Sequence, residues 1–219
     1  MTLGVDLVVP VKPLVAAKSR LRGAADHGLG ELGAHARLTL ALTHDTIAAA
    51  RAAARVRHLL VISSDPVVAA ELAAIGVEVA PDSAVPGLNA ALEHGAALLR
   101  AGDVAAVVGA LPADLPALRP TELDAAIDAA IALFDAGTAR RAYCTDANGT
   151  GTTFLLAAPG VTLEPRFGAG SGRRHRRSGA HPLPGAWPGL RRDVDTPHDL
   201  HHATHLGLGP HTRAILTPS

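Results

Sequence analysis

The chain has 219 residues, enough for one α/β domain with a core of its own, and its 20 Lys and Arg residues balance 20 Asp and Glu residues. Without net charge, no overall field would draw the protein to nucleic acid or an anionic membrane, so an anion site must come from local clusters of charge. A single cysteine, Cys144, excludes an intramolecular disulfide, and no apolar run is long enough to span a bilayer, so we expect a cytoplasmic protein.

Segments with strand-like and helix-like periodicity alternate along the first part of the chain, which predicts a mainly parallel sheet covered by helices. In chain order we expect a strand at 6–12, a helix at 36–55, a strand at 58–64, a helix at 65–76, a strand at 77–82, a helix at 87–102, a strand at 104–116 and a helix at 121–137. Thr121, three residues before Asp124, is the predicted cap of the last of these helices.

The second part of the chain predicts further strands separated by loops rich in glycine and arginine. We expect strands at 141–146 and 152–159, a strand at 189–195, a closing helix at 196–207 and a partly ordered tail from about 208. No repeat or linker divides the sequence, which predicts one α/β domain over 1–219 with helices on both faces of a mixed, mainly parallel sheet.

The loop after the first expected strand is basic. Between Val9 and Gly23 it carries Lys12, Lys18, Arg20 and Arg22 and no acid. Sheets of this kind bind ligands at the carboxyl ends of their strands, where backbone amides and cations can surround a triphosphate. A solvated loop with scattered charge is the alternative to a phosphate site.

Two further strand ends carry carboxylates. Asp114 lies near the end of the strand expected at 104–116. Asp193 and Asp195 lie two apart in the strand expected at 189–195, so they would face the same side. Magnesium usually takes one or two protein carboxylates and completes its shell with phosphate oxygens and water. Asp114 is otherwise explained as a turn or helix cap.

Residues 146–153 and 167–180 are predicted to form two walls of one anion pocket. Their glycines allow backbone amides to approach an oxyanion, and hydroxyls come from Thr152, Thr153 and Ser171. Charge would come from Arg173, Arg174, His175, Arg176 and Arg177. The alternatives are a disordered basic loop or an RNA-binding patch, but the segment lacks the interleaved aromatic residues on which bases stack.

Asn89 falls in the first turn of the helix expected at 87–102, where its amide would reach a base or ribose edge. An ordinary helix start explains it equally well. Three other signals are set aside: the G-x-G-x-x-G at 28–33, which follows no strand; the histidine pairs in 198–205, which are typical of a solvated helix face; and Cys144, which is expected to be a small buried side chain.

Six segments in the same order resemble one known family over nearly the whole chain. They are VPVKPLVAAKSRL, GLNAAL, ADLPAL, GTGTT, FGAGSGRRHRRSGA and LRRDVDTPHDL. They look like the guanylyltransferases of coenzyme F-420 biosynthesis, which act on 2-phospho-L-lactate or phosphoenolpyruvate. The resemblance implies the nucleotidyltransferase fold shared with molybdenum-cofactor guanylyltransferases, and transfer of GMP from GTP to one of these acids with release of diphosphate.

The resemblance also implies roles for individual residues. Asp114 and Asp193 would hold Mg²⁺, with Asp195 as a helper. The opening loop with Lys12, Lys18 and Arg22 would hold the GTP phosphates, the two lysines acting as catalytic groups, and Asn89 would lie near the nucleoside. The acid-binding Thr, Gly and Ser correspond to Thr152, Gly168 and Ser171, and one extra residue between the Thr and the Gly keeps Thr153 as an alternative.

Two other functions remain open from the sequence. One is a nucleotidyltransferase for another phosphate acceptor, such as molybdopterin or a sugar phosphate. The other is a nucleotide-binding protein without catalytic activity.

Overall fold

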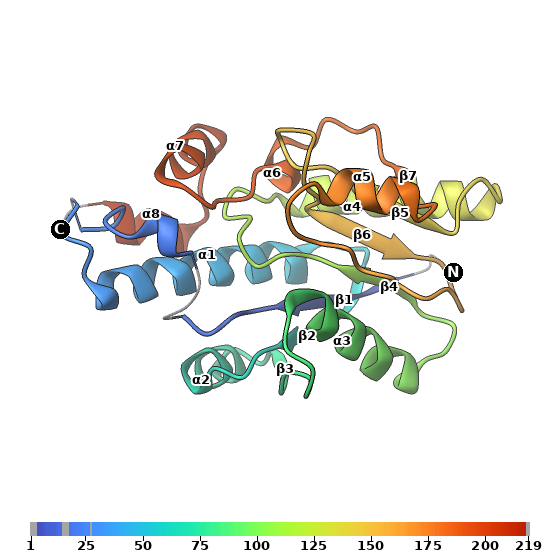
Figure 1. Cartoon of the computed structure of the whole chain (residues 1–219), viewed down its shortest axis with the longest axis horizontal. Helices are drawn as coiled ribbons and strands as arrows, with labels where there is room; N and C mark the ends of the chain where they lie inside the picture. Colours follow the sequence, from blue (N-terminus) through green and yellow to red (C-terminus); the bar gives the residue numbers. More distant parts are fainter. Residues whose placement is uncertain (1–3, 15–17, 27, 218–219) are drawn as a thin grey trace.

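A computed structural model describes residues 4–14, 18–26 and 28–217. Within these residues the strands form one mixed sheet in the order β3-β2-β1-β4-β6-β5-β7 (Figure 1). The strands are β1 (Val5–Pro10), β2 (Val56–Ile62), β3 (Glu78–Ala80), β4 (Val107–Ala110), β5 (Arg141–Cys144), β6 (Phe154–Ala157) and β7 (His181–Pro182). The predicted fold class, a mixed and mainly parallel sheet in an α/β domain, is confirmed.

Helices cover both faces of this sheet (Figure 1). They are η1 (Ser19–Leu21), α1 (Leu32–Ala52), α2 (Pro66–Ala74), α3 (Leu88–Gly102), α4 (Pro120–Asp135), α5 (Ser171–Arg177), α6 (Pro188–Arg191), α7 (Pro197–Leu206) and α8 (Pro210–Leu216). In the described ranges no helix combines the length and the apolar character that a membrane crossing requires.

The central strand β1 divides its side chains between two cores. Leu7 and Val9 pack with α1 and α4, whereas Val8 packs with α3 on the opposite face. Both faces are therefore dry, as expected for a parallel strand with neighbours on both sides. Gly95 lets α3 approach closely, since a Cβ at this position would lie 2.5 Å from Val8 Cγ1.

The sheet has two halves that differ in strand direction. Strands β3, β2, β1 and β4 are parallel, and β6 pairs antiparallel with both β4 and β5. The carboxyl ends of β1, β4 and β5 and the start of β6 consequently lie at one edge. The loops at this edge carry most of the polar residues that the sequence singled out.

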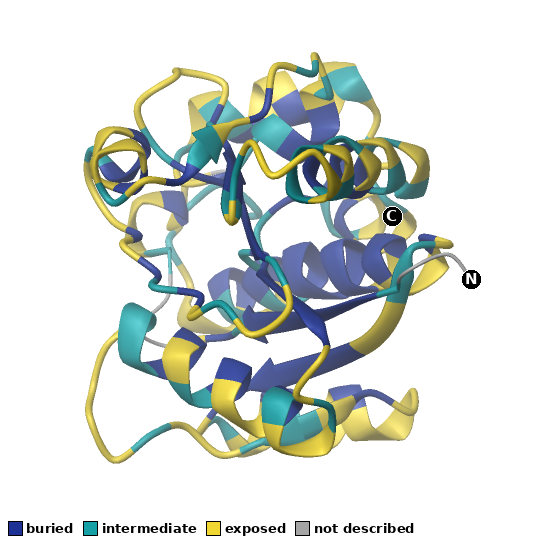
Figure 2. Cartoon of the chain, turned by 90° about the vertical axis from the view of Figure 1, so that its right-hand side faces the viewer, coloured by how far each residue is buried: buried dark blue, intermediate teal, exposed yellow. Residues whose placement is uncertain are grey.

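Helix α1 is buried on several sides (Figure 2) because α8 packs on it from outside the sheet layer. Asp45 of α1 is buried and accepts hydrogen bonds from the backbone amides of His211 (3.0 Å) and Thr212 (2.8 Å) at the start of α8. The free amides of a helix N-terminus thus compensate a buried carboxylate. Residues 210–216, predicted to belong to a partly ordered tail, form this helix.

Two predicted elements are wrong. Residues 189–195 form no strand: Pro188 opens the short helix α6, and the Arg191 side chain donates to the carbonyls of Leu183 (3.0 Å) and Gly185 (2.8 Å). This segment is held by a side chain and not by a β ladder. Part of the expected 167–180 loop is the helix α5.

The cap predicted at Thr121 is also wrong. Helix α4 begins one residue earlier, at Pro120, and its N-cap is Arg119. Asp124 has a different task, because its carboxylate accepts the backbone amides of Ala54 (3.1 Å) and Arg55 (2.8 Å) and so ties α4 to the segment between α1 and β2.

Candidate functional site

A cavity of about 630 Å³ opens at the sheet edge formed by the carboxyl ends of β1, β4 and β5. Two walls face each other across it. One comprises the loops after β1 and β4 together with the segment before α7, and the other comprises residues around 150–152 and 167–171. Residues 146–153 and 167–180, predicted to form opposite walls of one anion pocket, instead both contribute residues to the second wall.

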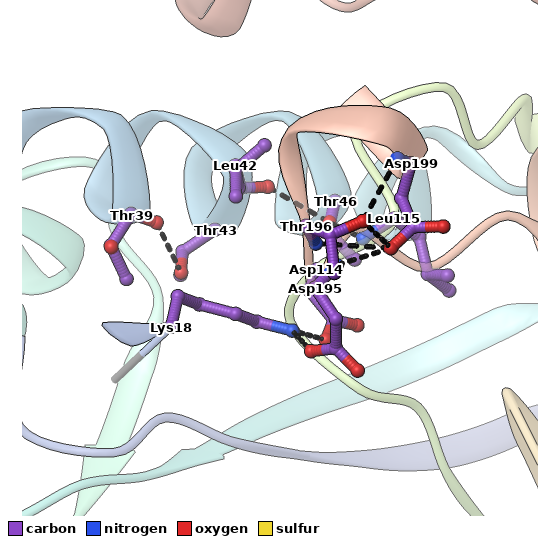
Figure 3. A network of polar contacts seen from close by, with 10 residues as sticks. All are labelled: Lys18, Thr39, Leu42, Thr43, Thr46, Asp114, Leu115, Asp195, Thr196 and Asp199. Carbon is purple, nitrogen blue, oxygen red and sulfur yellow. Dashed lines mark hydrogen bonds and ion pairs between the residues drawn. The ribbon is translucent and has the colours of Figure 1, made fainter. Parts of the chain in front are cut away.

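On the first wall, Lys18 joins two carboxylates (Figure 3). Its Nζ contacts Asp114 Oδ2 and lies 2.5 Å from Asp195 Oδ1. The segments that carry the two carboxylates are joined by the backbone, since the Val194 amide donates to the Asp114 carbonyl at 3.0 Å. Asp193 and Asp195, on either side of Val194, are therefore brought beside Asp114 without a β strand.

Neighbouring contacts hold both carboxylate segments (Figure 3). Thr46 of α1 accepts the backbone amide of Leu115 at 2.9 Å, next to Asp114. Thr196 and Asp199 form a capping box at the start of α7, and Asp199 also accepts the Asp195 amide at 3.3 Å. Helix α1 on one side and the first turn of α7 on the other thus orient the cluster.

The charges in this cluster shift one another. Burial disfavours the charge on Lys18, but the carboxylates of Asp114 and Asp195 outweigh it and raise the pKa of Lys18, which stays protonated. Burial, and then the charges of Asp114, Asp195 and Asp146, raise the pKa of Asp193 to about 7, while Lys18 opposes this shift. One ammonium therefore faces an excess of carboxylate, which favours a further cation.

The residues present fit a divalent cation. Asp114 Oδ1 is buried and has no hydrogen-bond partner in the described part of the chain, while Oδ2 binds Lys18. Asp193 lines the same cavity. Within the described ranges, no three His, Cys, Asp or Glu side chains are grouped so as to hold a metal ion alone. Carboxylate oxygens are hard donors suited to Mg²⁺ or Mn²⁺.

The basic loop after β1 contributes unequally to the cavity. Lys12 and Lys18 line it, and so does Arg20. Arg22 does not: it follows η1, is exposed, and lies outside the cavity lining. The expectation that Arg22 contributes to a nucleotide site is therefore not supported by its position, whereas Arg20 is part of the cavity lining. Residues 15–17 of the loop lie outside the described residues.

The opposite wall contains three of the four predicted acid-binding residues. Thr152, Gly168 and Ser171 line the cavity, whereas Thr153 is fully buried and does not. The adjoining segments pack closely, because the Gly172 amide donates to the Thr150 carbonyl at 3.0 Å and a Cβ at Gly172 would lie 3.0 Å from the Gly151 carbonyl oxygen. Of the two threonines only Thr152 lines the cavity, and its role in binding the acid stays a prediction.

The arginines of α5 have a different place from the one expected. Arg173, Arg176 and Arg177 are exposed and do not line the cavity. Arg174 turns back and donates to the carbonyls of Arg166 (3.1 Å), Phe167 (3.1 Å) and Ala169 (2.6 Å). Its role is to brace the 166–170 turn, in which Gly168 has a φ of 114° that favours glycine.

Asn89 also braces this turn. Its Oδ1 accepts the Phe167 amide at 2.8 Å and its Nδ2 donates to the Phe167 carbonyl at 3.3 Å. Asn89 is not part of the cavity lining, and its neighbour Leu88 is. In this structure the Asn89 amide links α3 to the opposite wall, and its contact with a nucleoside stays a prediction.

Two residues at the site were given no individual role by the sequence analysis. Asp146 lines the cavity and accepts the Thr150 amide at 2.8 Å, which holds the 146–151 turn. His175, one of the five basic residues expected to supply charge, is fully buried behind Thr152. Ser171, Gly172 and His175 are buried in α5, a helical spacing visible in the sequence once the segment is treated as a helix.

The three signals set aside lie outside the cavity. The G-x-G-x-x-G segment at 28–33 follows η1 and not a strand, and its last glycine, Gly33, lies in the first turn of α1. The four histidines in 198–205 are exposed on α7. Cys144 is fully buried at the end of β5, and burial raises the pKa of its thiol to about 11.

Comparison of the sequence with known proteins shows similar chains of nearly equal length. The chain is 51% identical to a phosphoenolpyruvate guanylyltransferase from Geodermatophilus obscurus over 211 residues, which is 96% of this chain and 93% of the relative. It is 50% identical to one from Salinispora arenicola over 215 residues, covering 98% and 94%. In a scan against protein-family models, none matches.

Solved structures share the fold at low sequence identity. A nucleotidyl transferase from Methanothermobacter superposes with a TM-score of 0.61 at 17% identity, covering 93% of this chain and 97% of that one. A protein from Mycobacterium tuberculosis, solved in complex with manganese, gives a TM-score of 0.53 at 20% identity and covers 94% and 100%.

Proposed function

The chain belongs to the family of phosphoenolpyruvate guanylyltransferases, and from this premise we propose that its cavity joins the GMP part of GTP to phosphoenolpyruvate and releases diphosphate. The product is enolpyruvoyl-2-diphospho-5'-guanosine. The observation that carries the proposal is the pairing of two walls in one cavity: a lysine and carboxylate cluster on one side and hydroxyl and glycine positions on the other.

We assign the first wall to the nucleotide. Lys12, Lys18 and Arg20 would bind the triphosphate, because flexible cations next to free backbone amides neutralise phosphate charge. Asp114 and Asp193 would hold Mg²⁺, with Asp195 next to them. When bound, the metal withdraws charge from the phosphate oxygens and so favours attack on phosphorus.

The second wall is assigned to the acid. The Thr152 and Ser171 hydroxyls and the backbone at Gly168 would donate to its carboxylate and phosphate oxygens. The turn at 166–170 is held rigid by hydrogen bonds at Phe167. Arg174 and Asn89 donate to its carbonyl, and Asn89 also accepts from its amide. A rigid wall suits the recognition of a small phospho-acid.

Mutual repulsion of two polyanions is the main obstacle to this reaction. A phosphate oxygen of the acid attacks the α-phosphorus of GTP in line, and the bond from this phosphorus to the diphosphate oxygen breaks. No general base is needed, since the attacking phosphate is already ionised at neutral pH. The protein contributes orientation across the cavity and the positive charge of its lysines.

Release of diphosphate tests the proposal directly. Purified protein with GTP, Mg²⁺ and phosphoenolpyruvate should release diphosphate, with the diphosphate-linked product identified by ³¹P NMR. Trapping of the product by the enzyme that consumes it removes an unfavourable equilibrium. Absence of diphosphate release under these conditions would refute the proposal, and GTP binding without turnover would indicate a nucleotide-binding protein.

A panel of acceptors and nucleotides defines specificity in the same assay. We expect phosphoenolpyruvate to be used in preference to 2-phospho-L-lactate, and GTP in preference to ATP and CTP. Turnover with molybdopterin or a sugar phosphate, but not with either phospho-acid, would assign the fold to another acceptor. Arg20→Gln and Arg22→Gln form a matched pair, of which only the first should weaken GTP binding.

A further inference from the structure

His175 lies directly behind the wall assigned to the acid. It is fully buried in α5, and its ring packs edge-on against Phe167 at a centroid distance of 5.2 Å and tilted against Tyr143 at 5.8 Å. Both ring nitrogens are engaged: Nε2 lies 2.9 Å from the Arg166 backbone nitrogen, and Nδ1 lies 2.9 Å from Thr152 Oγ1.

These two contacts determine which nitrogen carries the proton. A backbone N–H can only donate, so Nε2 must accept from Arg166 and therefore carries no hydrogen. In a neutral imidazole the hydrogen is then on Nδ1. Consequently Nδ1–H donates to Thr152 Oγ1, and the Thr152 oxygen is the acceptor in this pair.

The surroundings of the ring favour its neutral form. Burial lowers the pKa of His175 to about 4, and the charges of Arg174, Arg141 and Arg166 act in the same direction. The remaining titratable neighbour, Tyr143, has its own pKa raised by burial and is uncharged at neutral pH. The aromatic contacts to Phe167 and Tyr143 leave the ring little freedom to flip.

We propose that His175 is a positioning residue that commits the Thr152 hydroxyl to donate into the cavity. Because Nδ1–H occupies a lone pair of Oγ1, the Thr152 hydrogen cannot point back at the ring. Thr152 lines the cavity, so its hydrogen is free for an anionic oxygen of the bound acid. This inference rests on the proposed function, since it takes the acid to bind at this wall.

The opposite tautomer would change the sign of this contact. With a hydrogen on Nε2, the Arg166 amide would lose its acceptor, and Thr152 would donate to Nδ1. Only the lone pairs of Oγ1 would then face the cavity, and these repel an anion. One buried ring thus makes the same hydroxyl attractive to the acid.

Two substitutions separate the two ring contacts. His175→Gln places an amide near the position of Nε2, so it can still accept from Arg166 but no longer reaches Thr152. His175→Asn places its amide near the position of Nδ1 and can still donate to Thr152. We expect His175→Gln to raise the KM for phosphoenolpyruvate about ten- to hundredfold, the loss expected for a hydrogen bond to a charged group.

The KM for GTP should change less than twofold in both variants, and His175→Asn should retain more affinity for the acid than His175→Gln. In a Thr152→Val background, His175→Gln should add no further loss, because the hydroxyl through which it acts is gone. Equal loss in the Gln and Asn variants, or fully additive losses with Thr152→Val, would overturn the proposal.

A measurement on the unmodified protein guards against a variant that does not fold. A long-range ¹H–¹⁵N spectrum distinguishes protonated from unprotonated ring nitrogens, and we expect a protonated Nδ1 and an unprotonated Nε2 for His175. A hydrogen on Nε2 would refute the inference even if the enzyme is active. Failure of the proposed function is a separate result, in which the unmodified protein forms no product.

Discussion

Replacement of His175 by Gln should change how the stability of the protein depends on pH. The pKa of His175 is held at about 4 in the folded protein by burial and then by Arg174, Arg141 and Arg166, against 6.5 for an unperturbed histidine. As pH falls below 6.5 the unfolded chain takes up the proton first, so stability decreases until the folded form is also protonated near pH 4.

The size of the effect follows from the difference between these pKa values. The two pKa values differ by about 2.5, which corresponds to about 3 kcal/mol in the free energy of unfolding. This contribution to stability is present in full above pH 6.5 and is lost by about pH 4. Asp193 acts in the opposite direction. Burial and neighbouring carboxylates raise its pKa to about 7, so the folded form takes up that proton first and stability increases as pH falls.

These opposing contributions make the wild-type curve alone uninformative, and the comparison with His175→Gln isolates the histidine. Urea unfolding followed by circular dichroism, at pH 7, 6, 5 and 4 with EDTA present, gives the free energy of unfolding of each protein. The wild-type free energy of unfolding minus that of His175→Gln should fall by about 3 kcal/mol from pH 7 to pH 4. Only the wild type loses stability through protonation of His175.

A matched control is His201→Gln, since His201 is exposed on α7. Its curve should run parallel to that of the wild type. If the wild-type free energy of unfolding minus that of His175→Gln stays constant from pH 7 to pH 4, the buried ring is not held neutral.

Three further results are expected. Asp114→Asn should lower kcat by more than about a hundredfold and weaken Mn²⁺ binding measured by calorimetry, whereas Asp128→Asn on α4 should change neither; retained turnover would exclude Asp114 as a metal ligand. Thr152→Val should raise the KM for the acid about tenfold or more, and Thr153→Val should leave it unchanged; equal effects in steady-state assays would contradict the assignment of the wall. Asn89→Ala should lower thermal stability by about 1–3 kcal/mol and raise the KM for the acid more than that for GTP, and a selective loss of GTP affinity would instead support a nucleoside contact.

Much of the fold could be predicted because its central strands have simple patterns. β1, β2 and β4 are short apolar runs between polar loops, and α2 has a readable start, since Asp65 caps it by accepting the Val67 amide at 2.9 Å. Where local propensity and tertiary packing agree, periodicity alone locates the element. The position of Asp114 on the carboxyl side of β4 followed from the same pattern, although the strand ends earlier, at Ala110.

The segments that were mispredicted depend on tertiary contacts. The pattern of residues 189–195 is that of a strand. In the structure the Leu190 amide donates to Glu122 of α4 at 3.0 Å, and the Arg191 side chain donates to the Leu183 carbonyl next to β7. The arginines of α5 read as a cationic wall, but a helix turns them outward and His175 inward. No sequence pattern specifies these partners.

The division of the sheet into a parallel and an antiparallel half has a consequence for how such a protein can acquire a new acceptor. The residues assigned to GTP and the metal come mainly from the loops after β1 and β4, while those assigned to the acid surround β5 and β6. The bidentate contact of Asn89 with Phe167 joins the halves. Grafting 146–180 from a homologue with another acceptor should exchange the recipient of the nucleotide and leave the residues assigned to GTP and the metal unchanged, provided that the contact of Asn89 with the grafted turn is kept.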